Sequence, residues 1–302
     1  MTFEPPQRLV RTLGETYGDA VAAKWLGELP DATQVAVSRR KLDVERVQSP
    51  GGRSSLVLLV RQQDGTPAAL KVAPPFARPD LERAALAHWN GWGTAQLLDG
   101  ASADGSLLLE RLRPEVSLHS LPEAKALLEA AGTVRRLWVE PPADHPFETV
   151  EERTARQADA MRATAGTAEP DALALVDAAL AARAELVVSP PELVLLHGNF
   201  RQSKVLGAER SPWLAVGPEP VVGERAYDLA RLVRDRVEDL VAAAVGPSST
   251  RRRVNRMADS LDVDRARLLG WTLFRAVESG VRALRAGRRQ DGELLLEFAG
   301  WL

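Results

Sequence analysis

The stretch LVLLHGNFRQSKVL, residues 193–206, contains side chains whose types and spacing could support chemistry. Four apolar residues lead into His197 and Gly198, a polar loop follows, and an apolar Val-Leu pair then resumes. A buried strand that ends at such a loop suits reactive groups, because loops held by rigid elements carry many binding and catalytic residues. This loop offers the amide of Asn199 and the ammonium group of Lys204.

Charged residues elsewhere in the chain could act together with this loop. Lys71 lies in AALKVA (68–73), a predicted strand, and Glu82 lies in PDLERAALAHWN (79–90). The second segment is predicted as a helix, because Pro and Asp suit the first turn of a helix. Downstream of the loop, the segment PEPVVGERAYDLA adds Glu219, Glu224 and Asp228.

The strand that carries Lys71 is predicted to belong to a small β-rich region. The segment SSLVLLVRQQ (54–63) precedes it, and Asp64-Gly65 between the two is a strong hairpin signal. Further strands are predicted at 95–99 and 106–112. Before this region, helices are predicted at 15–28 and 30–41, separated at Pro30, because proline suits a helix's first turn.

From Pro114 onward the pattern becomes mainly helical, with strand and loop at 193–217. The helical segments are predicted at 121–140, 148–166, 169–187 and 224–302, the last interrupted by GPSST at 246–250. This order predicts an α+β chain with a small β-rich N-terminal lobe, residues 1–113, and a larger helical C-terminal lobe, residues 114–302.

Three stretches, AALKVAPP, LLLERLRP and PEPVVGERAYDLARLVRDR, resemble the aminoglycoside phosphotransferases, in particular the branch of streptomycin and hydroxyurea kinases. The resemblance runs from about residue 15 to the end of the chain. It implies a two-lobed, protein-kinase-like fold. It also implies ATP as phosphate donor and a hydroxyl group of a small molecule, such as an antibiotic, as acceptor.

The resemblance assigns nucleotide-binding roles to residues of the first lobe. Lys71 would hold the α- and β-phosphates and would itself be held by Glu82. The backbone from Glu110 to Leu112 would contact adenine. The residues alone also fit blander alternatives, in which Lys71 is an exposed strand lysine and 110–112 a buried strand end. The segment SPGGRSS (49–55) fits either a phosphate-covering turn or a plain hairpin loop.

The family's transfer loop reads His-Gly-Asp, with a metal-binding Asn five residues after the Asp, and a second metal-binding Asp lies in Ile-Asp-Pro. Here these three positions hold Asn199, Lys204 and Gly217. An amide cannot take a proton, which removes assistance worth roughly 10²–10⁴ in rate. Lys204 would repel Mg²⁺ and Gly217 offers no carboxylate, although Mg²⁺ prefers carboxylate ligands. We therefore predict a pseudokinase that can bind ATP, and we do not expect Mg²⁺ as a cofactor.

Residues that maintain the fold match the family better. Asp228 matches the Asp that holds the loop's backbone, and Arg225 and Pro220 match as well. The alternative for Asp228 is a carboxylate on a helix surface. We further expect Lys204, with Lys71, to neutralise phosphate charge without a metal, the alternative being that Lys204 points to solvent and the cleft binds nothing.

Two other functions stay open at this point. One is a working but atypical small-molecule kinase that uses Glu219 or Glu224 as its base. The other is a binding or regulatory module that holds a nucleotide or metabolite in the cleft, or an unidentified protein partner on the helical lobe.

Composition limits the remaining functions. A net charge of −2 over 302 residues gives no field that favours nucleic acid or an anionic membrane. The absence of cysteine excludes thiolate catalysis and disulfides. No apolar run approaches the ~18 residues of a spanning helix, and the N-terminal sequence lacks a signal-like apolar core, so we expect a cytoplasmic protein. The four histidines, at 88, 119, 145 and 197, lack metal-ligand spacing.

Overall fold

The chain forms two compact units. The computed structural model describes residues 3–99, 104–164 and 170–302. The first unit comprises Met1–Val116 and Leu206–Val216, and the second comprises Ser117–Val205 and Gly217–Leu302. A single division after residue 113, as expected from the sequence, would instead assign Leu206–Val216 to the helical part.

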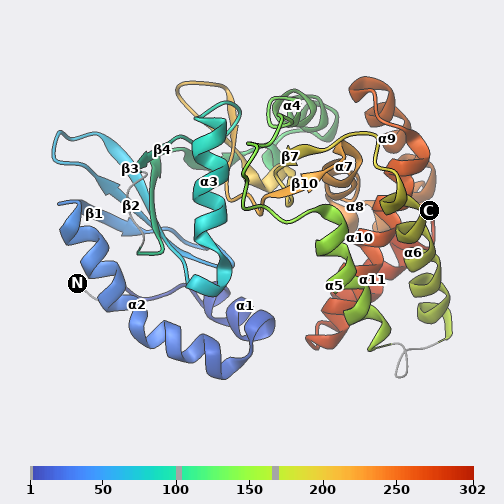
Figure 1. Ribbon diagram of the computed structural model, residues 1–302, viewed down its shortest axis with the longest axis horizontal. Coiled ribbons are helices and arrows are strands. Elements are labelled where there is room, and N and C mark those ends of the chain that lie inside the picture. The colour runs from blue at the N-terminus through green and yellow to red at the C-terminus, as the bar shows by residue number, and fades with distance from the viewer. Residues whose placement is uncertain (1–2, 100–103, 165–169) are drawn as a thin grey trace. The chain divides into compact units, whose positions relative to one another are not determined.

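A five-stranded antiparallel sheet forms the centre of the first unit (Figure 1). Its order is β1-β2-β3-β5-β4. The strands are β1 Asp43–Val47, β2 Leu56–Arg61, β3 Pro67–Val72, β4 Leu97–Asp99 and β5 Ser106–Glu110. The predicted hairpin is present, because the Asp64 side chain accepts from the backbone N–H of Thr66 at 2.9 Å and Gly65 takes a φ of 84°. Strand β1 was not predicted, since its residues are mostly exposed and do not alternate clearly.

The helices of the first unit correct the predicted break at Pro30. They are α1 Gln7–Tyr17, α2 Asp19–Arg39, α3 Pro79–Trp89 and the short η1 Pro75–Ala77. The chain turns between α1 and α2 at Gly18, whose φ of 89° favours glycine, and Pro30 lies inside α2. The buried residues Leu29 and Thr33 flank Pro30. The apolar side chains that α2 buries, Leu29 and Trp25 among them, offset the ~3 kcal/mol that an interior proline costs a helix.

A single apolar cluster joins α1 and α2 to the sheet. Leu9, Leu13 and Leu29 of the helices are fully buried in the same cluster as Leu58 and Leu70 of β2 and β3. Transfer of such side chains from water is worth about 1.5–3 kcal/mol each, so this cluster fixes the strands that carry the polar residues.

The second unit is mainly helical. Its helices are α4 Glu123–Arg135, α5 Val150–Arg162, α6 Pro170–Val188, α7 Arg225–Val233, α8 Val237–Ala242, α9 Gly246–Leu261, α10 Arg265–Arg285, α11 Arg289–Ala299 and the short η2 Leu118–Ser120 and η4 Gln202–Lys204. Helix α10 packs against α6, α7 and α11, and the ring of its buried Trp271 contacts both Tyr227 of α7 and the buried Phe274 of α10.

The predicted interruption at GPSST is wrong, because these residues form the first turn of α9. Pro247 lies in that turn, where its missing N–H has no helical partner to lose. The break lies just before, between the end of α8 at Ala242 and the start of α9 at Gly246. Proline therefore marked the start of a helix here, as it was expected to do at position 30.

Short strands frame the 193–206 segment. β7 Val194–Leu196 pairs antiparallel with β10 Val221–Gly223. A second small sheet has the order β6-β8-β9, with β6 Arg113–Ser117, β8 Val205–Gly207 and β9 Trp213–Ala215. The polar loop thus runs from the end of β7 to the start of β8.

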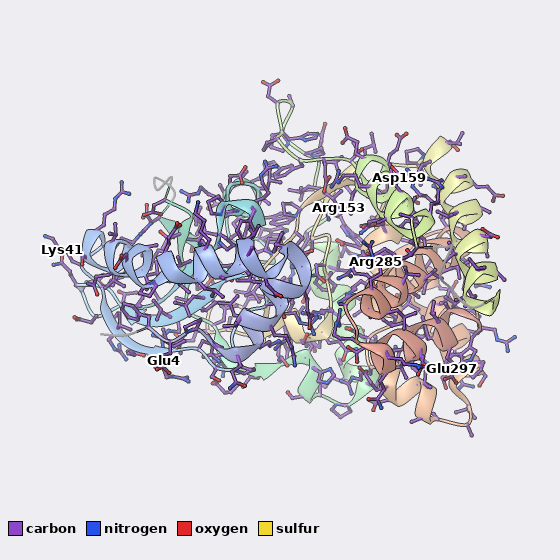
Figure 2. All side chains as sticks on the ribbon, turned by 90° about the horizontal axis from the view of Figure 1, so that it is seen from below. Glu4, Lys41, Arg153, Asp159, Arg285 and Glu297 are labelled. Atoms are coloured by element: carbon purple, nitrogen blue, oxygen red, sulfur yellow. The ribbon has the colours of Figure 1, made fainter. Side chains whose placement is uncertain are left out.

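Charged side chains of both signs cover each unit, as with Lys41 and Glu4 in the first and Arg285 and Glu297 in the second (Figure 2). This mixture agrees with the near-zero net charge. Within the described ranges, none of the helices combines the length and the apolar character that crossing a membrane requires.

Candidate functional site

Asp228 of α7 holds the start of the polar loop. Its carboxylate accepts hydrogen bonds from the backbone N–H groups of His197 and Gly198, both at 2.8 Å. The side chain is fully buried, so the alternative of a surface carboxylate is wrong. Burial raises the pKa of Asp228, and the Arg275 charge and the two N–H donors oppose this rise only in part.

The far end of the loop is held by a second carboxylate from beyond α7. Asp235 accepts from the backbone N–H of Gln202 at 2.6 Å. The Gln202 side chain in turn accepts from Nε of Arg236 at 2.8 Å. Because two buried or half-buried carboxylates fix its backbone, the loop presents its remaining side chains from a rigid support.

Asn199 donates from its side-chain amide to Oε1 of Glu219, which lies in the segment before β10. The same carboxylate oxygen lies 3.7 Å from Nζ of Lys204. Glu219 therefore joins Asn199 and Lys204, the two loop residues that are expected to depart from the family pattern. Sequence reasoning named Glu219 only as a stand-in base and missed that Asn199 and Lys204 both contact it.

Lys204 does not point to solvent, and its side chain is 18% exposed. Its Nζ donates to the backbone carbonyl oxygen of Gly217 at 2.6 Å. Gly217 has a φ of 61°, and a Cβ placed there would lie 3.5 Å from the same Nζ. The ammonium group of Lys204 thus lies against Gly217. Positions 204 and 217 are the two at which the family resemblance implies metal ligands.

The Glu219 carboxylate is held in its charged form. Burial would raise its pKa, but the positive charges of Lys204 and Arg153, with the Asn199 hydrogen bond, lower the pKa of Glu219 to about 2. Its side chain is nevertheless 62% exposed, so solvent screens these attractions. The carboxylate is ionised at any ordinary working pH.

Glu224 is not available to this loop as a base. It is buried, and it accepts from Nε of Arg267 at 2.6 Å and from Nε1 of Trp271 at 2.6 Å. Both carboxylate oxygens take part. Oε2 accepts from Nε of Arg267, while Oε1 accepts from Trp271 and from Nη2 of Arg267. Glu224 therefore ties α10 to the start of α7, and its candidacy as a base is wrong.

In the first unit, Lys71 of β3 donates from Nζ to Oε2 of Glu82 on α3. Their side chains are 12% and 8% exposed. The alternative in which Lys71 is an exposed strand lysine is therefore wrong. Oε1 of Glu82 is buried and has no hydrogen-bond partner within the described residues. The pair is present, while its role toward phosphates stays a prediction.

The expected adenine-contacting stretch lies at the end of β5. The backbone N–H of Glu110 already donates to the carbonyl oxygen of Gln96 at 2.8 Å. The Glu110 carboxylate accepts from the backbone N–H of Gln96 at 3.0 Å and from Arg210 at 2.9 Å. Leu112 is buried. Glu110 is therefore occupied by contacts within its own unit, and the role of 110–112 stays a prediction.

The residues around the loop do not fit a magnesium ion. Across the described ranges, no three His, Asp or Glu side chains lie close enough together to hold a metal ion. Glu219 is the carboxylate that approaches positions 199 and 204, and the Lys204 ammonium lies beside it. Mg²⁺ requires an octahedral set rich in oxygen ligands, which an adjacent ammonium group opposes.

Comparison with known proteins gives a family match over most of the chain. The model of the aminoglycoside/hydroxyurea antibiotic resistance kinases matches residues 40–287. Streptomycin 6-kinase of Streptomyces glaucescens is 32% identical, over 94% of this chain and 92% of that protein. Hydroxyurea phosphotransferase of Kitasatospora aureofaciens is 31% identical, over 93% of this chain and 79% of that protein.

Solved structures agree on the fold. A crystal structure of an aminoglycoside phosphotransferase aligns with a TM-score of 0.62 at 17% identity, over 89% of this chain and 96% of that one. A choline/ethanolamine kinase family protein from Mesorhizobium loti aligns with a TM-score of 0.60 at 15% identity, over 89% and 99%. The predicted α+β kinase-like fold, with its small antiparallel sheet and its helical part, is confirmed. On its sequence, the chain belongs to the aminoglycoside/hydroxyurea antibiotic resistance kinases.

Proposed function

We propose that this protein is a pseudokinase that binds ATP without magnesium and does not transfer its phosphate. The contact between Lys204 Nζ and the Gly217 carbonyl oxygen carries the proposal. It fixes a positive charge between the two positions from which the family would coordinate a metal. A lysine ammonium binds phosphate oxygens as a point charge, so it can balance phosphate charge without an ion.

The arrangement of Asn199 supports the loss of transfer. Its amide nitrogen is a hydrogen-bond donor to Glu219, and an amide has no basic group with which to accept the proton of a hydroxyl acceptor. Phosphoryl transfer depends on positioning and on charge stabilisation by metal ions. This loop offers neither a base at position 199 nor a ligand set for the metal.

Two observations support the binding of a nucleotide, namely the Lys71–Glu82 pair and a nucleotide complex of a protein with a similar fold. The Lys71–Glu82 pair, largely removed from solvent, holds an ammonium group in a fixed place on β3. A related aminoglycoside phosphotransferase, with a TM-score of 0.61, is described as a ternary complex with ADP and hygromycin B. We infer that this chain retains a nucleotide ligand.

Calorimetric titration with ATP in EDTA tests this function. The wild type is expected to bind, and Lys204→Ala is expected to weaken binding about tenfold or more, the effect of losing a charged hydrogen-bond donor. Lys125→Ala is the matched control, because Lys125 is exposed on α4 of the same unit. Equal affinities in the Lys204→Ala and Lys125→Ala proteins would remove Lys204 from the site.

One contact favours a second candidate, an atypical active kinase. The Glu219 carboxylate lies against Asn199, so a base is present next to the position where the family has its Asp. Two relatives are a streptomycin 6-kinase and a hydroxyurea phosphotransferase. Phosphorylation of streptomycin and of hydroxyurea by this protein should therefore be measured with Mg²⁺, with Lys71→Ala as the control. Activity above that control that disappears in Glu219→Gln would establish this candidate and contradict the pseudokinase.

A further inference from the structure

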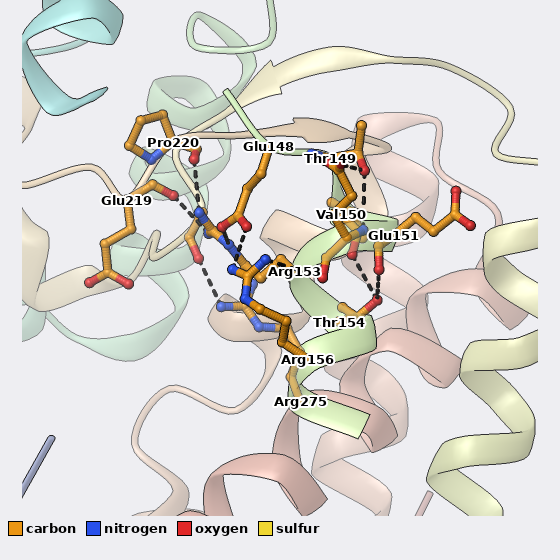
Figure 3. Close-up of polar contacts among 12 residues, drawn as sticks. Glu148, Thr149, Val150, Glu151, Arg153, Thr154, Arg156, Glu219, Pro220 and Arg275 are labelled. Atoms are coloured by element: carbon orange, nitrogen blue, oxygen red, sulfur yellow. Dashed lines mark hydrogen bonds and ion pairs between the residues drawn. The ribbon is translucent and has the colours of Figure 1, made fainter. Parts of the chain in front are cut away.

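Arg153 of α5 binds the chain segment that lies just before β10. Its Nη1 donates to the carbonyl oxygen of Glu219 at 2.9 Å, and its Nη2 donates to that of Pro220 at 2.8 Å. Its Nε donates to Oε1 of Glu148 at 2.7 Å. Figure 3 shows the Glu219 carbonyl facing Arg153, while the carboxylate of Glu219 points away. The guanidinium fork thus spans two consecutive carbonyl oxygens.

The start of α5 fixes the place of Arg153. Thr149 and Glu152 form a capping box, in which each side chain accepts from the backbone N–H of the other residue. The carbonyl oxygen of Glu148 accepts from the backbone N–H of Val222 in β10 at 2.9 Å. The Arg153 side chain is 15% exposed, and Glu148 balances its charge. Arg153 therefore acts from a rigid support.

The polar loop holds the same segment from the other side. The backbone N–H of Glu219 donates to the carbonyl oxygen of His197 at 2.9 Å. A Cβ on Gly198 would lie 1.8 Å from the Glu219 carbonyl oxygen and 2.8 Å from Nη1 of Arg153. This close approach, together with a φ of 75°, requires glycine at position 198. The backbone of Glu219 is therefore fixed between the loop and Arg153.

The segment that Arg153 binds carries the two groups that contact Lys204. The Gly217 carbonyl oxygen accepts from Nζ of Lys204, and the Glu219 carboxylate lies 3.7 Å from the same Nζ. Residues 217–220 belong to no helix or strand. Hydrogen bonds from other segments must therefore fix these residues, and Arg153 supplies two of them.

We propose that Arg153 is a positioning residue, which holds residues 217–220 so that their oxygen atoms keep the Lys204 ammonium group in place. The inference rests on the proposed function, in which this ammonium group faces the phosphates of ATP. Arginine suits the task, because its planar fork presents a fixed pair of N–H donors that a lysine does not have. Arg153 acts on the nucleotide through Lys204, and not by a contact of its own.

Calorimetric titration with ATP in EDTA tests this role. Arg153→Gln is expected to weaken binding about threefold to tenfold, the range of an ordinary hydrogen bond, because Lys204 is then held less firmly. Arg183→Gln is the matched control, because Arg183 donates to the Glu151 carbonyl oxygen and the Thr154 hydroxyl group, which lie on α5 outside the site. Equal affinities in the Arg153→Gln and Arg183→Gln proteins would overturn the role.

A double variant shows whether Arg153 acts through Lys204. Arg153→Gln combined with Lys204→Ala is expected to bind ATP as tightly as Lys204→Ala alone, because the group that Arg153 positions is then absent. A further loss of about threefold or more in the double variant would show that Arg153 affects the nucleotide independently of Lys204. That result would contradict the positioning role.

Arg153→Lys separates position from charge. This variant keeps the positive charge, but a single ammonium group does not reproduce the planar fork across two carbonyl oxygens. Its affinity for ATP is expected to be lower than that of the wild type, by about twofold or more. Wild-type affinity in Arg153→Lys would assign the effect to charge alone and contradict the proposal.

Hydrogen exchange of the Glu219 amide gives a readout that needs no nucleotide. This N–H donates to His197, so its protection reports how firmly the segment is held. Protection is expected to fall in Arg153→Gln and to persist in Arg183→Gln, and equal protection in the two variants would overturn the role. A wild type that does not bind ATP, with protection lost in Arg153→Gln, would refute only the nucleotide function.

Discussion

At the scale of single residues, Lys204, Gly217, Glu219 and Asn199 form one connected group. Lys204 binds the Gly217 carbonyl oxygen, and Glu219 contacts both Lys204 and Asn199. The group is internally balanced, because one ammonium charge faces one carboxylate. A nucleotide phosphate that approaches Lys204 must therefore compete with Glu219, so Glu219 limits the affinity of the proposed site.

Glu219→Gln should accordingly bind ATP more tightly in EDTA than the wild type does. The expected gain is about twofold to fivefold, the range of an exposed charge pair, because the Glu219 side chain is 62% exposed. Calorimetry would measure it, with Glu238→Gln as control for the loss of an exposed carboxylate in the same unit. Weaker binding in Glu219→Gln would instead mean that Glu219 holds Lys204 in its binding position.

At the scale of elements, α7 is the support on which the loop depends. Asp228 lies in its first turn and accepts from two consecutive backbone N–H groups after β7. Replacing this carboxylate with a methyl group leaves both buried donors unsatisfied, and each such group costs about 1–3 kcal/mol.

Asp228→Ala should therefore lower the free energy of unfolding by about 2–4 kcal/mol. Urea unfolding would measure this loss. Asp159→Ala is a suitable control, because Asp159 is exposed on α5 and pairs with its helix neighbour Arg162. A loss for Asp228→Ala no larger than that of the control would show that the loop is held by other contacts.

Elements with strong local signals were predictable, and those decided by packing were not. The hairpin at Asp64-Gly65 and the helix opening at Pro79 follow from turn and capping preferences. Pro30 and Pro247 misled in opposite ways, because burial carried α2 through one proline while α9 begins at the other. Proline limits local geometry but does not say which side of a helix boundary it occupies.

At the scale of the whole molecule, the family and its fold could be predicted from sequence motifs. That positions 199, 204 and 217 depart from the family pattern stays a prediction. The contacts among those positions could not be predicted. Lys204 and Gly217 lie in different loops, and which way the lysine turns depends on loop geometry that no local pattern encodes.

Restoring the family pattern tests whether the rest of the chain still supports transfer. The triple variant Asn199→Asp, Lys204→Asn, Gly217→Asp replaces the ammonium with a carbonyl ligand and adds two carboxylates. A Cβ at 217 meets nothing closer than the Lys204 side chain, and Asp tolerates a positive φ better than most residues.

In this variant, we expect the rate of Mg²⁺-dependent ATP hydrolysis or of phosphorylation of an acceptor to exceed that of the wild type by a factor of about 10² or more. A coupled assay for ADP would measure it, with the same triple variant carrying Lys71→Ala as control. If the variant binds Mg²⁺-ATP yet turns over no faster than this control, the acceptor side has diverged as well.

The most direct measurement of the central claim is the affinity of the wild type for ATP in EDTA compared with that in excess Mg²⁺. If Lys204 supplies the cation, the affinity in EDTA should equal or exceed the affinity with Mg²⁺, because the ammonium group repels a second cation at the same place. Binding that occurs only with Mg²⁺, or is far tighter with it, would contradict a metal-free nucleotide site.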